Sequence, residues 1–105
     1  MAFRSIRKTT ADGPKLWRYD RLAYEEALDA GGLLAYFRGD LDGRRRCLSL
    51  CIWDTQTHTR DAATLAAHRS AAALYREMYV SYEVERYALQ RGSELGTIRL
   101  EPLAG

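Results

Sequence analysis

The sequence lacks long hydrophobic runs and has almost no excess of charge of one sign. No stretch of about 18 apolar residues occurs, so no membrane-spanning segment is expected. Residues 1–13 contain no apolar core of the kind that a secretory signal needs. Lysine and arginine together number 16 and aspartate and glutamate 14, a net charge of +2. This balance gives no reason to expect nucleic acid or an anionic membrane as the main partner.

Cysteine is also scarce, and the two that occur, Cys47 and Cys51, do not form a disulfide framework. Both lie in a segment with strand alternation, where four residues span about 13 Å. A disulfide joins Cα atoms within about 7 Å, so the two cannot pair with each other. The CxxC spacing of a zinc site is missing as well. We expect unpaired thiols, no metal and a cytoplasmic location, where thiols stay reduced.

Short motifs that mark common enzyme classes are absent. The chain has no glycine-rich phosphate loop with a lysine, no dinucleotide fingerprint, no serine nucleophile elbow and no HExxH. Any chemistry is therefore expected to run without a cofactor, through acid–base side chains or on a reactive substrate.

What is present is the composition of an ordinary globular domain. Hydrophobic residues make up 47% and charged residues 29% of the chain, which argues against disorder. With 105 residues, the sequence predicts a single domain over 1–105. Residues 1–14 are interpreted as either a short strand or a flexible tail.

Two helices are predicted from apolar periodicity. The first covers residues 15–30 and ends at the glycines that follow it. Its inward face consists of Leu16, Tyr19, Ala23, Ala27 and Ala30. The second is longer and runs from about residue 60 to residue 81. Its core stripe consists of Ala63, Ala67, Ala71, Leu74 and Met78.

Strand patterns fill the remaining segments. Residues 33–38 and 44–54 flank a turn-rich connection and predict an antiparallel hairpin. Both faces of 44–54 are largely uncharged, so this strand is predicted to be buried on both sides. Residues 83–90 and 97–100 follow as two further strands, and Pro102 limits the extension of the last one.

The predicted order is (β)αββαββ, an α+β chain. In a chain this short, both helices are expected to pack on one face of a single antiparallel sheet. The other face would then be bare and largely uncharged, which is unfavourable for a monomer in water. Stacking of two copies, sheet to sheet, would cover it, so the pattern predicts a homodimer.

Several local sequences carry a resemblance to a known superfamily. These are GLLAYFRG at 32–39, CLSLCIWD at 47–54, AAH at 66–68 and MYVSYEVERY at 78–87. With the order of elements, they resemble the dimeric α+β barrel superfamily. Its members include antibiotic-biosynthesis monooxygenases, small polyketide cyclases and haem-degrading monooxygenases. More narrowly, the pattern over about residues 16–100 is similar to that of a group of short uncharacterised bacterial and fungal proteins.

The resemblance implies a ferredoxin-like sheet paired into a dimeric α+β barrel. It also implies a cofactor-independent enzyme of secondary metabolism that acts on a polyketide-like or aromatic small molecule, as a cyclase or monooxygenase. In such proteins a strand ends in an aromatic residue and a helix with a histidine follows; Trp53 and His68 occupy comparable places. The superfamily's first strand often supplies an asparagine, whereas residues 3–8 offer only Ser5 and basic residues.

His68 is the candidate catalytic residue. At 100° per residue it shares a helix flank with Ala72, Tyr75 and Tyr79. A histidine beside two phenols can act as a general base, because its pKa lies near neutrality. The alternative is a histidine that is hydrogen-bonded to a carbonyl or solvated.

Five residues are candidates for substrate binding: Tyr36, Arg38, Trp53, Tyr75 and Tyr79. Trp53 ends a strand and can wall a pocket by stacking, or it belongs to the core or the dimer interface. Tyr36 and Arg38 share a strand face and can hold a carboxylate or an enolate. Alternatively they form an interface pair satisfied by Glu83 or Glu85.

Three functions remain open from the sequence. An enzyme requires a pocket into which His68 points. A non-catalytic dimeric small-molecule-binding or accessory protein requires the space between helices and sheet to be filled by side chains. Haem binding through His68 is the third alternative.

Overall fold

Strand β1 (Ala2–Arg7) shows that the amino-terminal segment is a strand and not a tail. The computed structural model describes residues 1–94 and 96–103. In it, β1 pairs antiparallel with β3 (Arg46–Trp53) on one side and with β4 (Tyr79–Glu85) on the other. The segment therefore lies inside the sheet.

The main sheet has four strands in the order β2-β3-β1-β4, where β2 is Leu33–Phe37. The predicted hairpin is confirmed, because β2 pairs antiparallel with β3, with Tyr36 opposite Cys51 and Phe37 opposite Leu50. All pairs in this sheet are antiparallel, which confirms the α+β class.

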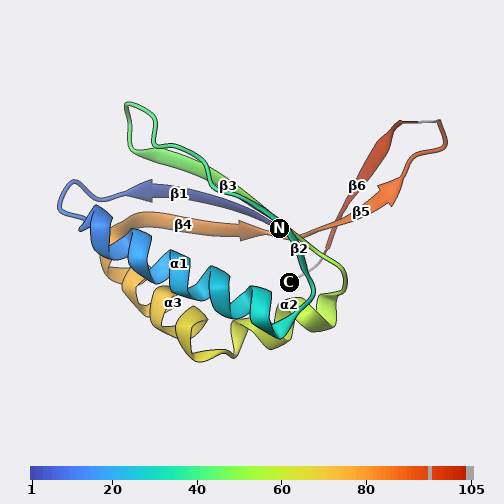
Figure 1. Cartoon of the computed structure of the whole chain (residues 1–105). Helices are drawn as coiled ribbons and strands as arrows, with labels where there is room; N and C mark the ends of the chain where they lie inside the picture. Colours follow the sequence, from blue (N-terminus) through green and yellow to red (C-terminus); the bar gives the residue numbers. More distant parts are fainter. Residues whose placement is uncertain (95, 104–105) are drawn as a thin grey trace.

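Helix α1 (Gly13–Ala30) begins two residues before the predicted start. Asp12 caps it by accepting a hydrogen bond from the Lys15 backbone N–H at 3.0 Å, and Pro14 occupies the first turn. Gly31 ends it with φ +88°, a conformation that glycine adopts without strain. The helix packs against α3 (Ala66–Met78), and both lie on the same side of the sheet (Figure 1).

The prediction of one long helix over residues 60–81 is wrong. The chain forms α2 (Gln56–Ala63), breaks at Thr64 and Leu65, and continues as α3. The Thr64 hydroxyl donates to the Asp61 carbonyl at 2.7 Å, and Leu65 is extended. Side-chain bonds of this local kind compete with helix propagation, and hydrophobic spacing does not reveal them. As a result Ala63 is exposed and Ala62 is buried in its place, while residues 79–81 belong to β4.

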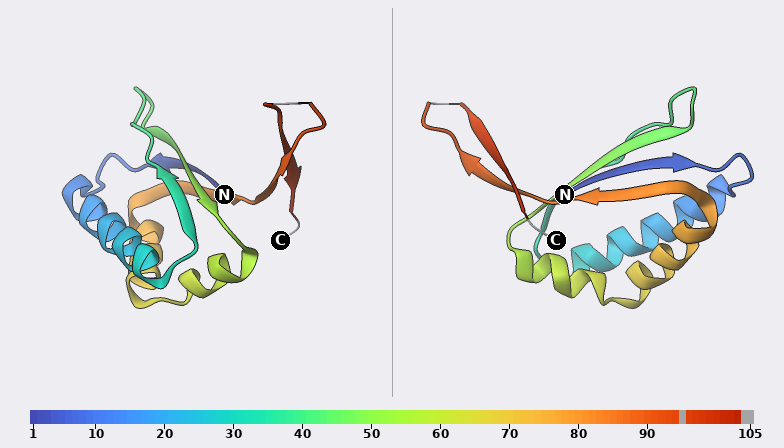
Figure 2. Two further views of the ribbon diagram at one scale, coloured as in Figure 1. Left: turned by 45° about the vertical axis from the view of Figure 1, so that its right-hand side comes forward. Right: turned by 180° about the vertical axis from the view of Figure 1, so that it is seen from behind.

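The strand predicted at 83–90 is also divided. β4 ends at Glu85, and β5 (Tyr87–Arg91) pairs with β6 (Ile98–Pro102) as a separate two-stranded hairpin. Figures 1 and 2 show this hairpin standing apart from the main sheet. Over the described residues the chain therefore forms two sheets, because β5 and β6 pair with each other and not with the main sheet.

The face of the sheet away from the helices is uncovered. The prediction that 44–54 is buried on both sides is wrong for this chain, since Leu48 is 44% and Leu50 42% exposed while Cys51 is buried. The buried apolar core is small and consists of Ala2, Leu16, Ala27, Cys51, Ala62, Ala71 and Leu74. Most of it lies where the helices meet each other and the sheet.

None of the helices in the described ranges is both long enough and apolar enough to cross a membrane.

Candidate functional site

An open space of about 1630 Å³ is lined by residues of both faces of the main sheet, of the helices and of the β5–β6 hairpin, and the cleft between the helices and the sheet is one part of it. The whole space exceeds the roughly 300–1,000 Å³ of common small-molecule pockets, which leaves room for a multi-ring ligand. All six residues singled out from the sequence line it: Tyr36, Arg38, Trp53, His68, Tyr75 and Tyr79.

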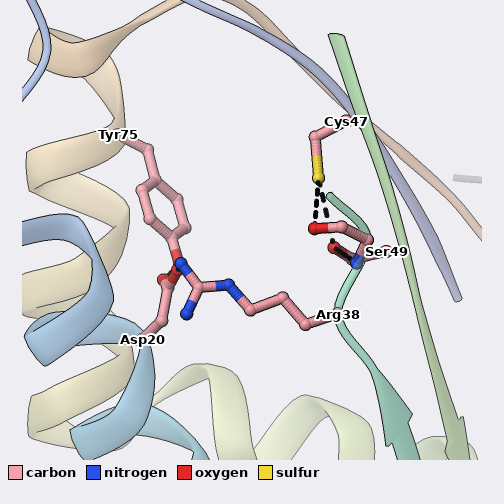
Figure 3. A network of polar contacts seen from close by, with 6 residues as sticks. Asp20, Arg38, Cys47, Ser49 and Tyr75 are labelled. Carbon is pink, nitrogen blue, oxygen red and sulfur yellow. Dashed lines mark hydrogen bonds and ion pairs between the residues drawn. The ribbon is translucent and has the colours of Figure 1, made fainter. Parts of the chain in front are cut away.

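The polar centre of the cleft is Asp20, a residue that the sequence reasoning missed. The Tyr75 hydroxyl of α3 donates a hydrogen bond to its Oδ1, and Nη2 of Arg38 lies 3.8 Å from its Oδ2. Figure 3 shows the three side chains meeting from α1, α3 and the end of β2. The Asp20 side chain is 14% exposed, so a mostly buried carboxylate lines the cleft.

A signal for Asp20 was present in the sequence. Leu16, Asp20, Ala23 and Ala27 follow the spacing of a buried helical stripe. An aspartate within such a stripe is unusual, because burying a carboxylate is costly unless it has partners. The predicted inward face used Tyr19 in its place, and so passed over the charged residue.

Burial raises the pKa of Asp20, and the Tyr75 hydrogen bond and the Arg38 and Arg7 guanidinium groups oppose the rise. Burial also raises the pKa of Tyr75, and the neighbouring Asp20 carboxylate raises it further. The phenol therefore keeps its proton and donates it to the carboxylate in a hydrogen bond. The Tyr75 hydrogen bond therefore holds Oδ1 of Asp20.

Tyrosine rings form the walls around this centre. Tyr75 stacks on Tyr82 with ring centroids 4.8 Å apart and meets Tyr79 edge-on at 5.4 Å. On the other side, the rings of Tyr24 and Tyr36 lie 5.5 Å apart. Tyr82 was not singled out from the sequence. Such rings present flat apolar faces with hydroxyl groups at their rims, which suits a planar oxygenated ligand.

The first strand contributes Arg7 to the cleft. Its Nε is buried and has no hydrogen-bond partner among the residues described. A hydrogen bond with Arg7 lowers the pKa of Tyr79, although burial raises it more. In the sequence, the basic residues of this strand were only a departure from the superfamily pattern, but in the structure Arg7 lines the cleft.

Within this chain, the described ion pairs of Arg38 do not include Glu83 or Glu85. Glu85 accepts from Nε of Arg4 at 2.7 Å, and Arg38 faces Asp20 across the cleft. Burial raises the pKa of Tyr36, with a smaller opposing effect from Arg38. Arg38 and Tyr36 thus stand on the same wall with their polar ends in the cleft.

His68 lies in the first turn of α3, at the rim of the cleft. Its backbone N–H donates to Oε1 of Glu26 at 3.3 Å, and part of the residue is exposed to solvent. The neighbouring protein atoms lower the pKa of the imidazole by desolvation, and Glu26 opposes this. In the described part of the chain, no side chain hydrogen-bonds the ring.

Trp53 and the cysteines lie on the sheet wall. Trp53 ends β3 as predicted, and its Nε1 donates to the Cys51 sulfur at 3.0 Å. The Cys47 sulfur donates to the Gly39 carbonyl at 3.3 Å (Figure 3). Both thiols are free, which confirms that they do not pair.

One protein family matches nearly the whole chain, over residues 1–102. The chain belongs to the PB2B2.08-like family. No curated protein matches the sequence. This membership assigns no chemistry, so the function of this PB2B2.08-like protein has to be argued from the cleft. Among the residues that the structure describes, no three His, Cys, Asp or Glu side chains are placed to hold a metal ion.

Proposed function

We propose that this chain is a small cofactor-independent enzyme of secondary metabolism that binds a polyketide-like or aromatic molecule in the cleft. The observation that carries the proposal is the contact of Asp20 with Tyr75 and Arg38 inside a tyrosine-walled cleft. Acid–base groups beside a cation and flat aromatic walls are what a cyclase or monooxygenase of this type requires.

In this proposal the aromatic substrate lies against the tyrosine rings and Trp53 by offset stacking. The guanidinium of Arg38 and the phenol of Tyr36 hold a substrate oxygen and stabilise negative charge that develops on it. The candidate proton acceptors of the cleft are His68 at the rim and Asp20 at the centre.

We also propose that the fold is ferredoxin-like and that two copies join as a dimeric α+β barrel. The strand order β2-β3-β1-β4, with α1 and α3 on one side of the sheet (Figure 2), supports this. The uncovered face presents Phe37, Leu48 and Leu50. It also carries the Arg4–Glu85 ion pair, so it has both signs of charge and can complement a second copy of itself. A cytoplasmic location, suited to the two free thiols, is part of the same proposal.

Non-catalytic binding is the second candidate. It shares the cleft but requires no proton transfer. A binding module was expected to have the space between helices and sheet filled by side chains. In this chain that space is an open cleft.

The resemblance to the dimeric α+β barrel superfamily implies haem as an alternative cofactor. An axial imidazole is normally oriented by a hydrogen bond from its second nitrogen. Within the described residues His68 has no such side-chain partner, so the residues present do not fit a haem ligand. We expect no Soret shift when haemin is added.

The proposal is tested by ligand binding to Trp53. In a Trp17→Phe background, Trp53 is the remaining tryptophan, and α-tetralone, a two-ring aromatic ketone, is the probe. We expect saturable fluorescence quenching, and about tenfold weaker binding in Arg38→Gln, since a lost hydrogen bond to a charged group costs roughly 1.5–3 kcal/mol.

The matched control is Arg44→Gln, an exposed arginine of the hairpin turn outside the cleft, which should leave binding unchanged. If α-tetralone fails to quench, or quenches equally in Arg38→Gln, the proposed binding site is wrong.

A further inference from the structure

We propose that Asp20 is the proton acceptor of this cleft, that Tyr75 positions it, and that the substrate is an aromatic ketone with a C–H next to its carbonyl. The inference rests on the proposed function and deepens it by naming the base and the substrate class. Its support is the placement of a carboxylate beside a guanidinium in the same cleft.

The spacing of the two charged groups is the first argument. Oδ2 of Asp20 and Nη2 of Arg38 are 3.8 Å apart, and both side chains line the cleft. This is a long ion pair, and Arg38 keeps 34% of its side chain exposed. Its remaining N–H groups are able to bind a ligand oxygen. A carbonyl on Arg38 therefore brings its neighbouring carbon toward the carboxylate.

The role of Tyr75 is the second argument. Its hydroxyl donates to Oδ1 of Asp20 and leaves Oδ2 on the side of Arg38. A base whose second oxygen is held in place is already oriented for proton transfer. Tyr75 itself is fixed by its stacking on Tyr82.

The comparison with His68 is the third argument. His68 is exposed at the rim and its ring has no side-chain partner in the described part of the molecule. Asp20 is enclosed, oriented and next to a cation. Enolisation requires a base and an oxyanion stabiliser within one substrate's width of each other, and Asp20 with Arg38 satisfies this.

The proposed step balances without an oxidant. Asp20 takes the proton from the carbon beside the carbonyl, and the C–H electron pair becomes the C=C bond. The C=O π pair moves to the oxygen, where Arg38 and Tyr36 stabilise the enolate. Return of the proton to the same carbon regenerates the ketone, and its transfer to the enolate oxygen gives the enol, an isomer of the ketone.

The surroundings of Asp20 adjust its strength as a base. The titratable and charged groups that act on it or share its cleft wall are Arg7, Tyr36, Arg38, Tyr75, Tyr79 and Tyr82. Burial raises the pKa of Asp20 in spite of the two arginines, which brings the carboxylate closer to the basicity that proton abstraction needs.

The experiment follows exchange of the hydrogens next to the carbonyl of α-tetralone in D₂O by NMR, with binding measured by fluorescence on the same samples. We expect the protein to accelerate exchange. Asp20→Asn should reduce the rate about 10²–10⁴-fold while binding stays within about threefold, and Asp20→Glu should restore part of the rate. Arg44→Gln is the control and should match the wild type.

The dependence of the exchange rate on pH shows whether Tyr75 positions Asp20 or only supports the fold. The rate should rise with pH as Asp20 ionises, and this limb should be missing in Asp20→Asn. Because the Tyr75 hydrogen bond lowers the pKa of Asp20, Tyr75→Phe should move the limb to higher pH as well as slowing exchange.

Three outcomes would overturn the inference. Binding without accelerated exchange removes the proposed catalysis but leaves the binding site. A larger loss in His68→Gln than in Asp20→Asn makes His68 the base and leaves the proposed function standing. Failure of α-tetralone to bind removes both proposals together.

Discussion

Asp20 combines a central position in the cleft with an unfavourable setting for its charge. Its pKa in the folded chain is raised above the ordinary value of 3.8, mainly by burial. Ionisation therefore destabilises the folded state relative to the unfolded one. Residues that serve a site often carry such a cost in stability.

The first prediction follows from the raised pKa of Asp20 in the folded chain. The stabilising contribution of Asp20 is fully present below the unfolded pKa and is lost as pH rises through the higher folded pKa. At pH 7, Asp20→Asn should raise the melting temperature, and the difference should shrink as pH falls toward 4. Thermal melts across this range measure it. A destabilised Asp20→Asn at pH 7 would contradict the argument.

The second prediction concerns the cysteines. Cys51 is buried and accepts from Trp53 Nε1, whereas Cys47 is half-buried. Cys51→Ala should cost about 1–3 kcal/mol, because the partly buried Trp53 donor loses its acceptor and a buried side chain is truncated. Each kcal/mol lowers the melting temperature by roughly 4–8 °C. Cys47→Ala should cost less. Equal melting of Cys51→Ala and wild type, or an intramolecular bridge detected by mass spectrometry, would refute the structural role.

At the scale of elements, the start of α3 depends on a side chain from another helix. Its N-cap residue, Leu65, makes no side-chain capping bond. Instead, the Glu26 carboxylate of α1 accepts from the Ala67 backbone N–H at 3.1 Å and from that of His68 at 3.3 Å. A carboxylate at a helix N-terminus satisfies free N–H groups and interacts favourably with the helix dipole.

The third prediction tests this cap. Glu26→Ala should destabilise the chain by about 1–2 kcal/mol, in the range of other helix caps, and Glu26→Gln by less. The neighbouring Glu25→Ala removes only an exposed ion pair with Arg21 and should cost under about 0.5 kcal/mol. Chemical denaturation gives both values. Equal costs for the two alanine variants would mean that the cap contributes nothing.

At the scale of the whole molecule, the face of the main sheet away from the helices is uncovered. Leu48, Leu50 and Phe37 lie exposed on it, and the β5–β6 hairpin carries further exposed apolar residues. Exposed apolar patches of this kind usually mark an interface. A second copy stacked sheet to sheet is the occupant that we propose.

The fourth prediction is the oligomeric state. Sedimentation at micromolar concentration should return twice the chain mass of 12.0 kDa. Leu48→Glu places a charge in the proposed interface and should shift the population to monomer. Leu22→Glu, at an exposed position of α1 on the helix side, is the control. A stable monomer at high concentration would rule out the dimer.

The sequence alone determined the α+β class, the hairpin of β2 with β3, the first helix and the unpaired cysteines. These depend on interactions between residues close in the chain, whose periodicity and turn residues are visible in one dimension. The boundaries that it missed, at Thr64–Leu65 and at Arg86, depend on local caps and on which strand pairs with which. Hydrophobic spacing does not encode either of these.

The site was only half visible for a related reason. Tyr36, Arg38, Trp53, His68, Tyr75 and Tyr79 were named from the sequence, and they line one cleft. Asp20 meets Tyr75 at a separation of 55 residues, and Arg7 reaches the cleft from the first strand. Single-chain periodicity places each residue on a face of its own element. Only the packing of α1, α3 and the sheet decides which of those faces meet, and therefore which carboxylate lies beside Arg38.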